Sequence, residues 1–276
     1  MIDILLSTYN GEAHLREQID SILGQTFKDI KLLVRDDGSS DGTVGILNEY
    51  AAADSRVVLS SDDKCNLGAF ASFMKLVEHS EAPYFLFADQ DDVWLPDKVE
   101  KLLSRMADSE SESGNGIPIV VFSDLKIADE NLTIIDPSLW HFQQFDPNIC
   151  RDWRSLLAQN VVLGCSMMAN AKARNLSLPY LLPDMPHDQW VALTAAKNGR
   201  IDFIREATIL YRQHGNNYSG ANRFTLSYAI SRIPNFVNTI WAYHHATSVF
   251  SGVTTLGLII RKIRLNFKRF DRREGF

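Results

Sequence analysis

The sequence predicts an α/β fold: a Rossmann-type, mostly parallel sheet flanked by helices, with a helical extension at the C-terminus. The main observation is alternation. Short apolar runs at residues 2–6, 30–34 and 84–88 each lead through a polar loop into a segment with helical apolar spacing, and a further short run lies at 57–60. Strands and helices that alternate in this way form parallel sheets with right-handed crossovers. We therefore expect the loops after these strands to lie along one edge of the sheet.

The first loop, residues 7–12, follows strand 2–6 and contains Ser7, Thr8 and Tyr9. The aromatic ring of Tyr9 at the end of a strand suits stacking on the base of a nucleotide. An ordinary half-buried aromatic residue is the alternative interpretation of Tyr9.

Acidic residues follow strand 30–34, where Asp36 and Asp37 precede the glycines Gly38 and Gly42. The glycines permit a sharp turn, and turn and capping chemistry explains the polar residues after Asp37. This chemistry does not explain Asp36 and Asp37 themselves, because two acids at the end of a buried strand are costly without partners.

Three carboxylates lie between strand 84–88 and a helix that starts near Asp97, at positions Asp89, Asp91 and Asp92. Crowded carboxylates repel one another unless a cation neutralises them, and all-oxygen sites suit Mg²⁺ or Mn²⁺. A polar loop that caps the helix would account for Asp97 and Asp92, but not for Asp89 together with Asp91. We therefore predict a metal site here. Because the chain has no glycine-rich dinucleotide motif and no P-loop, we expect metal to hold any bound phosphate.

Beyond residue 100 the chain is expected to contain a polar surface loop, a hairpin and further strands. The expected elements are a loop at 108–116, a strand at 117–124, a hairpin over 127–135 that turns at 129–131, a buried strand with a bulge over 160–168, and two strands at 201–204 and 207–211. The loop is expected because its residues form no apolar face.

Four segments of the chain resemble glycosyltransferase family 2: residues 7–10, 36–43, 66–68 and 89–98. The resemblance covers about residues 1–218 and is nearest to bacterial rhamnosyltransferase-like members that build cell-surface polysaccharide. It implies the GT-A fold and inverting transfer of a sugar from a nucleoside-diphosphate sugar, with Mn²⁺ or Mg²⁺ as cofactor.

The same resemblance implies roles for individual residues. Tyr9 would stack on the nucleobase, Asp37 would accept a hydrogen bond from a pyrimidine imide, and Asp91 would bind the metal directly, with Asp89 nearer the ribose or donor sugar. The full set of implied donor-binding residues is Ser7, Thr8, Tyr9, Asp36, Asp37, Asn66, Asp89, Gln90 and Arg212, and the implied metal ligands are Asp89, Asp91 and His214.

Asp188 is the residue we expect to act in the chemical step. It falls at the start of a helix that runs to about Asn198, where the helix dipole favours an ionised acid. The position suits a structural cap as well as a general base. The pair His187 and Asp188 resembles the catalytic pair of the family, which implies that Asp188 is the base. For His187, orientation of the acceptor or of a phosphate remains open.

Arg212 and His214 follow the last predicted strand. The resemblance implies that Arg212 contacts the diphosphate and that His214 binds the metal. A histidine at an ordinary turn is the alternative for His214, since nothing in the sequence places it near Asp91.

Composition limits the function classes. The chain has 276 residues and a net charge of −6, which argues against nucleic-acid binding. The three cysteines, Cys65, Cys150 and Cys165, are odd in number and widely spaced, so neither a disulfide framework nor a zinc motif is expected. The first residues lack the basic segment of a secretory signal. A cytoplasmic enzyme is therefore expected.

The C-terminal end is basic. Residues 261–276 contain seven Lys and Arg against two acids, and Ile260, Ile263, Phe267 and Phe270 recur at helical spacing. An amphipathic basic helix predicts docking on an anionic membrane surface, here the cytoplasmic face of the inner membrane. Packing on the domain and a contact in a homodimer are the alternatives.

Together these observations predict two parts: residues 1–218, with the donor and acceptor sites, and a basic helical extension at 221–276. The resemblance implies dTDP-rhamnose as the donor, with UDP-sugars next, and a glycan or a lipid-linked oligosaccharide as the acceptor. A sugar-nucleotide pyrophosphorylase is a rival, but residues 7–16 lack its basic glycine-rich triphosphate loop. A non-catalytic binding module is the other rival. Its weakness is that Asp37, Asp91 and Asp188 are all present.

Overall fold

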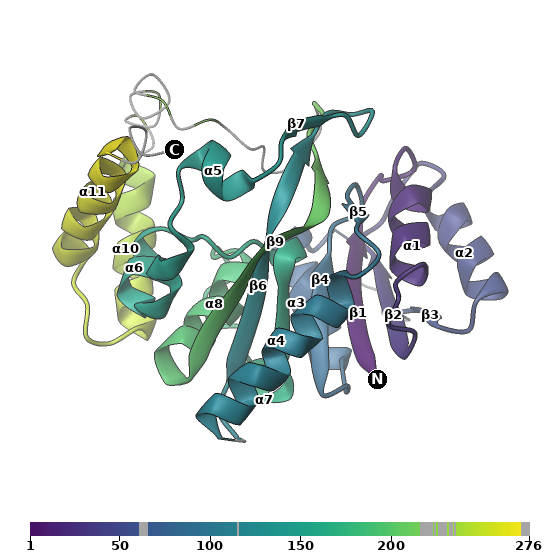
Figure 1. Ribbon diagram of the computed structural model, residues 1–276, viewed down its shortest axis with the longest axis horizontal. Coiled ribbons are helices and arrows are strands. Elements are labelled where there is room, and N and C mark those ends of the chain that lie inside the picture. Colours follow the sequence, from purple (N-terminus) through teal and green to yellow (C-terminus); the bar gives the residue numbers. More distant parts are fainter. Residues whose placement is uncertain are drawn as a thin grey trace.

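The computed structural model describes residues 1–60, 66–114, 116–215 and 236–271, together with Arg223, Thr225, Ser231 and Pro234. It confirms an α/β fold, with one twisted sheet between two layers of helices (Figure 1). The strands are β1 Ile2–Thr8, β2 Ile30–Asp36, β3 Val57–Leu59, β4 Tyr84–Ala88, β5 Val93–Trp94, β6 Ile119–Ala128, β7 Ile134–Asp136, β8 Met167–Asn170 and β9 Arg200–Arg212. The helices are α1 Leu15–Leu23, α2 Thr43–Ala53, α3 Ala69–His79, α4 Lys98–Ser113, α5 Leu139–Gln143, α6 Trp153–Ala158, α7 Ala171–Leu176, α8 His187–Asn198, α10 Phe236–Val249 and α11 Thr255–Asp271. Short 3₁₀ turns lie at Pro147–Arg151 and Gly164–Ser166.

The strand order is β3-β2-β1-β4-β8-β6-β9-β5, with β7 paired to β6. The first four strands are parallel, with Thr8 opposite Asp36 and Leu6 opposite Ala88. Their carboxyl ends therefore meet at one edge, as the sequence predicts. In the other half of the strand order, β8 runs antiparallel to both β4 and β6, whereas β6 and β9 are parallel.

Two apolar clusters lie on opposite faces of the sheet, because side chains alternate along each strand. In β1, Leu5 belongs to one cluster, and Ile4 and Leu6 belong to the other. Helices α3 and α8 cover the face of Leu5, while α1, α2 and α4 cover the opposite face. The sheet edge that carries the loops is thus held rigid from both sides.

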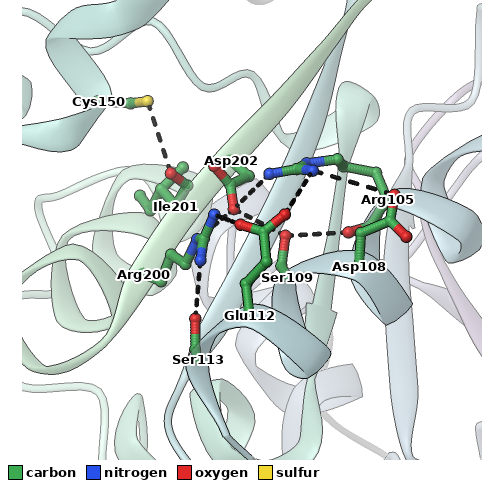
Figure 2. Close-up of polar contacts among 9 residues, drawn as sticks. All are labelled: Arg105, Asp108, Ser109, Glu112, Ser113, Cys150, Arg200, Ile201 and Asp202. Carbon is green, nitrogen blue, oxygen red and sulfur yellow. Dashed lines mark hydrogen bonds and ion pairs between the residues drawn. The ribbon is translucent and has the colours of Figure 1, made fainter.

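The polar run predicted as a loop at 108–116 is instead the last part of α4, so that prediction is wrong as far as Ser113. Figure 2 shows why the run is helical: its polar side chains face β9 and pair there. Asp202 accepts a hydrogen bond from Ser109 Oγ at 2.7 Å and pairs with Arg105 Nη2 at 3.1 Å. The network includes Arg105, Ser109, Glu112, Ser113, Arg200 and Asp202. Ion pairs here replace the apolar face that helix prediction looks for.

Two further predictions are corrected. The strands expected at 201–204 and 207–211 are one strand, β9, whose register against β6 shifts between Ser123 and Asp124 where Arg205 and Glu206 turn outward. The strand expected over 160–168 is wrong for most of its length. Only Met167 and Met168 of that range belong to a strand, β8, and a 3₁₀ turn at Gly164–Ser166 precedes it. The hairpin predicted over 127–135 is confirmed by the antiparallel pairing of β6 with β7.

The helices α10 and α11 lie together at one end of the molecule, beside α6 (Figure 1). Tyr243 of α10, Phe250 directly after that helix and Leu258 of α11 belong to the apolar cluster on the Leu5 face. Tyr243 also donates a hydrogen bond to Ala158 O at 2.8 Å. The predicted boundary at 218–221 lies outside the described residues. Among the helices that the structure describes, none combines the length and the apolarity needed to cross a bilayer.

Candidate active site

The three predicted loops meet at the carboxyl edge of β1, β2 and β4. Asp36, at the end of β2, accepts hydrogen bonds from Thr8 Oγ1 at 2.9 Å and from the backbone N–H groups of Gly38 and Ser39. Asn10 N–H donates to Ser39 Oγ at 2.9 Å. In this structure Asp36 and Thr8 therefore tie the first two loops to each other.

Asp37 is buried and joins β2 to the segment before α3. Its carboxylate pairs with Arg35 Nη1 at 2.7 Å and accepts hydrogen bonds from Leu67 N–H at 2.9 Å and Gly68 N–H at 2.8 Å. The backbone of Asn66 also donates to Asp37 O at 2.9 Å. The two motifs are thus one structural unit. Ser7 Oγ reaches the same region through a 2.7 Å hydrogen bond to Ser72 Oγ.

The first and third loops are joined by Gln90. Its side-chain amide accepts from Tyr9 N–H at 2.9 Å and donates to Tyr9 O at 3.1 Å. Gly11 makes this possible, since a Cβ at that position would lie 2.4 Å from Gln90 Oε1. The Tyr9 side chain is left 53% exposed, so an aromatic ring faces solvent from a backbone that is held at two points.

Beneath the third loop lies a buried group of charges. Asp92 and Lys98 are both wholly buried, and the Lys98 ammonium lies 3.8 Å from the ring centre of Trp94. Burial raises the pKa of Asp89 to about 7, and the carboxylates of Asp91 and Asp188 add to the effect. Burial lowers the pKa of Lys98 to about 7, against the opposing pull of nearby acids.

This cluster suits a cation. Asp92 Oδ1 accepts from Arg212 N–H at 3.1 Å, whereas Asp92 Oδ2 is buried and has no hydrogen-bond partner among the described residues. Oxygen atoms of Asp89 and Asp92 and the sulfur of Cys165 lie within 4.8 Å of one another. An orphaned buried oxygen beside crowded carboxylates is the situation that a bound cation relieves.

His214 lies beside Asp91, which the sequence could not establish. His214 Nε2 is 2.8 Å from Asp91 Oδ2. The neighbouring Arg212 is only 3% exposed; its Nε donates to Asp91 O at 2.9 Å and its Nη1 to Glu130 O at 2.6 Å, and it also pairs with Glu17. Arg212 therefore fixes the acidic loop against the end of β9.

His14 is a member of the site that sequence reasoning missed. Its ring centre lies 5.1 Å from that of His214, with an angle of 41° between the planes. Burial lowers the pKa of His14, and the positive charges of Arg212 and His214 lower it further. One signal was available in the sequence: His14 stands directly before α1, where Ser, Thr, Asp or Asn is usual.

Asp188 lies in the first turn of α8, and its charge acts on Asp89. Its Oδ2 accepts from Gly164 N–H at 2.9 Å and its Oδ1 from Gln189 N–H at 2.6 Å. Burial nevertheless raises the pKa of Asp188 to about 6, because these bonds only partly offset the loss of water. A carboxylate with this pKa can accept a proton near neutral pH.

His187 differs sharply from its neighbour. It is buried against Phe73, at a ring separation of 4.1 Å, and against Phe87 at 4.6 Å. Burial lowers its pKa to about 3, so the ring is neutral at physiological pH. Within the described part of the chain neither ring nitrogen has a hydrogen-bond partner. Of these two neighbouring residues, Asp188 is the one that can exchange a proton near neutral pH.

The site therefore combines an exposed aromatic platform, a carboxylate cluster with an imidazole beside it, and an acid with a raised pKa. The structure joins Tyr9 to Gln90 and His214 to Asp91, and it places Asp91 and Asp188 close enough for their charges to act on Asp89. Such an arrangement can hold a base, a metal-bound diphosphate and an attacking hydroxyl.

Two solved structures with similar folds are glycosyltransferases. TarS of S. aureus (residues 1–349), in complex with UDP-GlcNAc, is 15% identical with a TM-score of 0.63; the match covers all of this chain and 74% of that one. The mannosyltransferase PcManGT of Pyrobaculum calidifontis, in complex with GDP-Man and Mn²⁺, is 14% identical with a TM-score of 0.60, over all of this chain and 75% of that one. The likeness shows a GT-A fold, as the sequence predicts.

Relatives in sequence agree. The dTDP-rhamnosyl transferase RfbG of Shigella flexneri is 26% identical over 230 residues, which are 79% of this chain and 74% of that protein. An uncharacterized glycosyltransferase of Haemophilus influenzae is 26% identical over 223 residues, 79% of this chain and 67% of that protein. The model of glycosyl transferase family 2 matches residues 3–154, more than half of the chain. With this match and with the fold and site described above, the chain belongs to glycosyltransferase family 2.

Proposed function

We propose that this chain is an inverting, metal-dependent glycosyltransferase that moves a sugar from a nucleoside-diphosphate sugar to a growing glycan or a lipid-linked oligosaccharide. The observation that carries the proposal is the convergence at one sheet edge of Tyr9, the Asp89–Asp92 loop with His214, and Asp188. An aromatic platform, a cation site and a base are the three parts that such a transfer needs.

The donor binds across the edge formed by β1, β2 and β4. The exposed ring of Tyr9 stacks on the base, and Asp37 accepts a hydrogen bond from it, with Ser7, Thr8, Asp36 and Asn66 shaping the pocket. Gln90 keeps Tyr9 in place. Arg212 is proposed to lie at the diphosphate end of the donor, where its side chain holds the acidic loop through a hydrogen bond to Asp91 O.

Asp89, Asp91 and His214 are the residues proposed to hold the divalent cation, Mn²⁺ or Mg²⁺. The donor atoms that lie within 4.8 Å of one another in the described residues are those of Asp89, Asp92 and Cys165, so Asp89 is common to both sets. When bound, the cation neutralises the charge that develops on the leaving diphosphate. The protein's own part is to hold these ligands in place, and Arg212 contributes by donating a hydrogen bond to Asp91 O.

Asp188 takes the proton of the acceptor hydroxyl. As this oxygen forms its bond to the anomeric carbon, the bond from that carbon to the diphosphate oxygen breaks, and the nucleoside diphosphate leaves with the bonding electrons. One displacement of this kind inverts the configuration at the anomeric carbon. The N–H groups of Gly164 and Gln189 hold the Asp188 carboxylate for this step.

We favour dTDP-rhamnose as the donor because of the likeness to RfbG, with UDP-sugars next. Titration calorimetry with dTDP-rhamnose, UDP-GlcNAc and GDP-mannose, each with Mn²⁺, tests this choice. The tightest binding is expected for dTDP-rhamnose, and both EDTA and Asp91→Asn should weaken it at least tenfold. Tightest binding of a different donor would change the proposed donor sugar but not the proposed reaction. Binding that is indifferent to EDTA and to Asp91→Asn would contradict the metal site.

The enzyme is proposed to act at the cytoplasmic face of the membrane, where a lipid-linked acceptor is reached. Leu256, Ile260, Ile263 and Phe267 form an exposed apolar stripe on α11, at spacings of four, three and four residues. Phe270, which the sequence placed in this stripe, is half-buried instead. This stripe is the surface that we propose for docking, with a homodimer contact as its alternative.

A further inference from the structure

We propose that Lys98 is a positioning residue: it holds the turn Gly164–Ser166 in place and thereby fixes the proposed base, Asp188, relative to the acidic loop at residues 89–92. This inference rests on the proposed function, because it takes Asp188 as the base and the acidic loop as the cation site. Lys98 is wholly buried, so it acts through other residues rather than on the substrates.

The first observation concerns the surroundings of the Lys98 ammonium group. Lys98 is the first residue of α4, and its Nζ donates a hydrogen bond to Cys165 O, in the turn, and lies 3.8 Å from the ring centre of Trp94. The charges of Asp89 and Asp92 act on Lys98, but no carboxylate among the described residues forms a direct ion pair with it. The direct polar contact of this ammonium group is therefore with the turn.

Such a group is unfavourable for stability. A buried ammonium without a direct ion partner has lost its water and gains little in return. An unbranched apolar side chain such as Met would fill the same space without that loss, and replacements of this kind are often neutral or stabilising. Residues that work against stability are expected at functional sites. The buried charge of Lys98 is therefore better explained by a function.

The second observation is the path of the turn, which directly precedes β8. The side chain of Cys165 belongs to the apolar cluster on the sheet face that α4 covers. The preceding residue, Gly164, donates its N–H to Asp188 Oδ2 at 2.9 Å, and Asp188 belongs to α8 on the opposite face. The turn therefore connects the two helix layers. Lys98 holds it from one layer, and Asp188 is bonded to it from the other.

The third observation is that the turn packs closely against both parts of the site. A Cβ at Gly164 would lie 3.2 Å from Asp188 Cβ, so the turn rests directly on the start of α8. On its other side, the sulfur of Cys165 lies within 4.8 Å of carboxylate oxygens of Asp89 and Asp92. A shift of the turn would therefore move the base relative to the acidic loop. Displacements of about 1 Å in an active site can reduce the rate about 100-fold.

The test compares the full chain with Lys98→Met, which keeps an unbranched side chain and removes the ammonium group. Lys101→Met is the matched control, because Lys101 lies in the same helix but is partly exposed and pairs with Asp97 at the surface. Thermal unfolding shows whether each variant is folded. The pKa of Asp188 is measured by NMR of ¹³C-labelled aspartate carboxyls, and its signal is assigned by its loss in Asp188→Asn. Turnover is followed as release of the nucleoside diphosphate from the tightest-binding donor.

The hydrogen bond from Gly164 N–H lowers the pKa of Asp188, against the larger effect of burial. If Lys98 holds the turn, Lys98→Met weakens this bond and raises the pKa of Asp188 above about 6, whereas Lys101→Met leaves it unchanged. We also expect kcat to fall at least about tenfold in Lys98→Met while KM for the donor changes little. A role in stability alone would lower the melting temperature without moving the pKa of Asp188.

An unchanged pKa of Asp188 in folded Lys98→Met would overturn the proposal, whether or not turnover falls. Tighter Mn²⁺ binding in that case would show that Lys98 only offsets the charge of the acidic loop. If Lys98→Met does not fold, Trp94→Phe tests the same contact, because the smaller ring attracts the ammonium group less strongly. This variant should raise the pKa of Asp188 as well, and an unchanged value would overturn the proposal.

Asp188→Asn separates this proposal from the function on which it rests. If turnover survives in Asp188→Asn, the assignment of the base is wrong, and the NMR titration still decides whether Lys98 holds the turn. If Asp188→Asn loses turnover while Lys98→Met keeps both turnover and the pKa of Asp188, only the role of Lys98 is wrong.

Discussion

Individual residues in this site have properties that their neighbours impose. His187 and Asp188 are adjacent in the chain, yet burial against phenylalanines makes one a weak base and desolvation makes the other a usable one. The sequence could show that both residues are present at a helix start. It could not show their pKa values, because Phe73 and Gly164 come from distant segments.

Asp188→Asn should reduce the turnover rate at least about 100-fold while donor affinity changes little, because only proton acceptance is lost. In the unaltered enzyme, turnover should fall as pH drops through about 6, where Asp188 becomes protonated. This loss should be absent from the residual activity of the variant. Steady-state rates across pH 5 to 8, with calorimetry of the donor, measure both effects.

The raised pKa of Asp188 also determines how this residue affects the stability of the fold at different pH values. A carboxyl whose pKa is higher in the folded protein stabilises the fold below its unfolded pKa of about 3.8, and this contribution is lost as pH rises through about 6. Asp188→Asn should therefore not destabilise the protein at pH 7. Collapse of the fold or of donor binding would instead identify Asp188 as a structural cap.

At the scale of elements, α4 shows where reading a sequence fails. Its first turns have apolar residues at Val99, Leu102 and Met106 that pack on the sheet, and their spacing predicts a helix. Its last turns have none. Their helical state depends on Asp202, which lies about ninety positions further along the chain. No local sequence pattern predicts that contact.

Asp202→Asn should destabilise the protein by about 2 kcal/mol, because Arg105 and Arg200 would lose the negative charge with which they pair. Burial raises the pKa of Asp202, but hydrogen bonds from Ser109 and Arg200 outweigh it and leave that pKa below its usual value. Its contribution is therefore present at neutral pH and lost as pH falls below about 4. Urea unfolding measures the change.

Hydrogen exchange should locate that effect in the last two turns of α4. Asp108→Asn is the matched control, because Asp108 is 63% exposed and lies 4.0 Å from Arg105; such surface pairs contribute little. Equal effects of the two substitutions would show that the network does not hold the helix end.

At the scale of the whole molecule, the part that could be predicted is the part built from neighbouring segments. Three strand–loop–helix units gave the parallel half of the sheet and the edge with Tyr9, Asp37 and Asp91. The rest depends on β9, which crosses from a distant part of the chain. The proximity of His214 to Asp91, and of His14 to both, follows from that crossing and could not be read from spacing.

The C-terminal extension has two sides, and the structure changes how its proposed docking must be tested. Leu258 is buried in the core, and Arg261 pairs with Asp152 at 2.5 Å, so deletion of α11 would damage the domain. Arg264 and Lys268, in contrast, are exposed beside the apolar stripe. Substitutions at these two positions can test docking without disturbing the fold.

Arg264→Glu/Lys268→Glu should weaken binding to anionic phosphatidylglycerol vesicles by well over tenfold, since each basic residue at such a surface contributes on the order of 1 kcal/mol. Binding of the unaltered chain should also fall as salt rises, because salt screens these charges. Vesicle co-sedimentation measures both effects, with Lys28→Glu/Lys172→Glu as the matched control, because these two exposed lysines lie outside α11. Equal binding to neutral and anionic vesicles, or to neither, would contradict docking by charge. A dimer that Phe267→Glu dissociates in sedimentation experiments would then assign the stripe to a second copy of the chain.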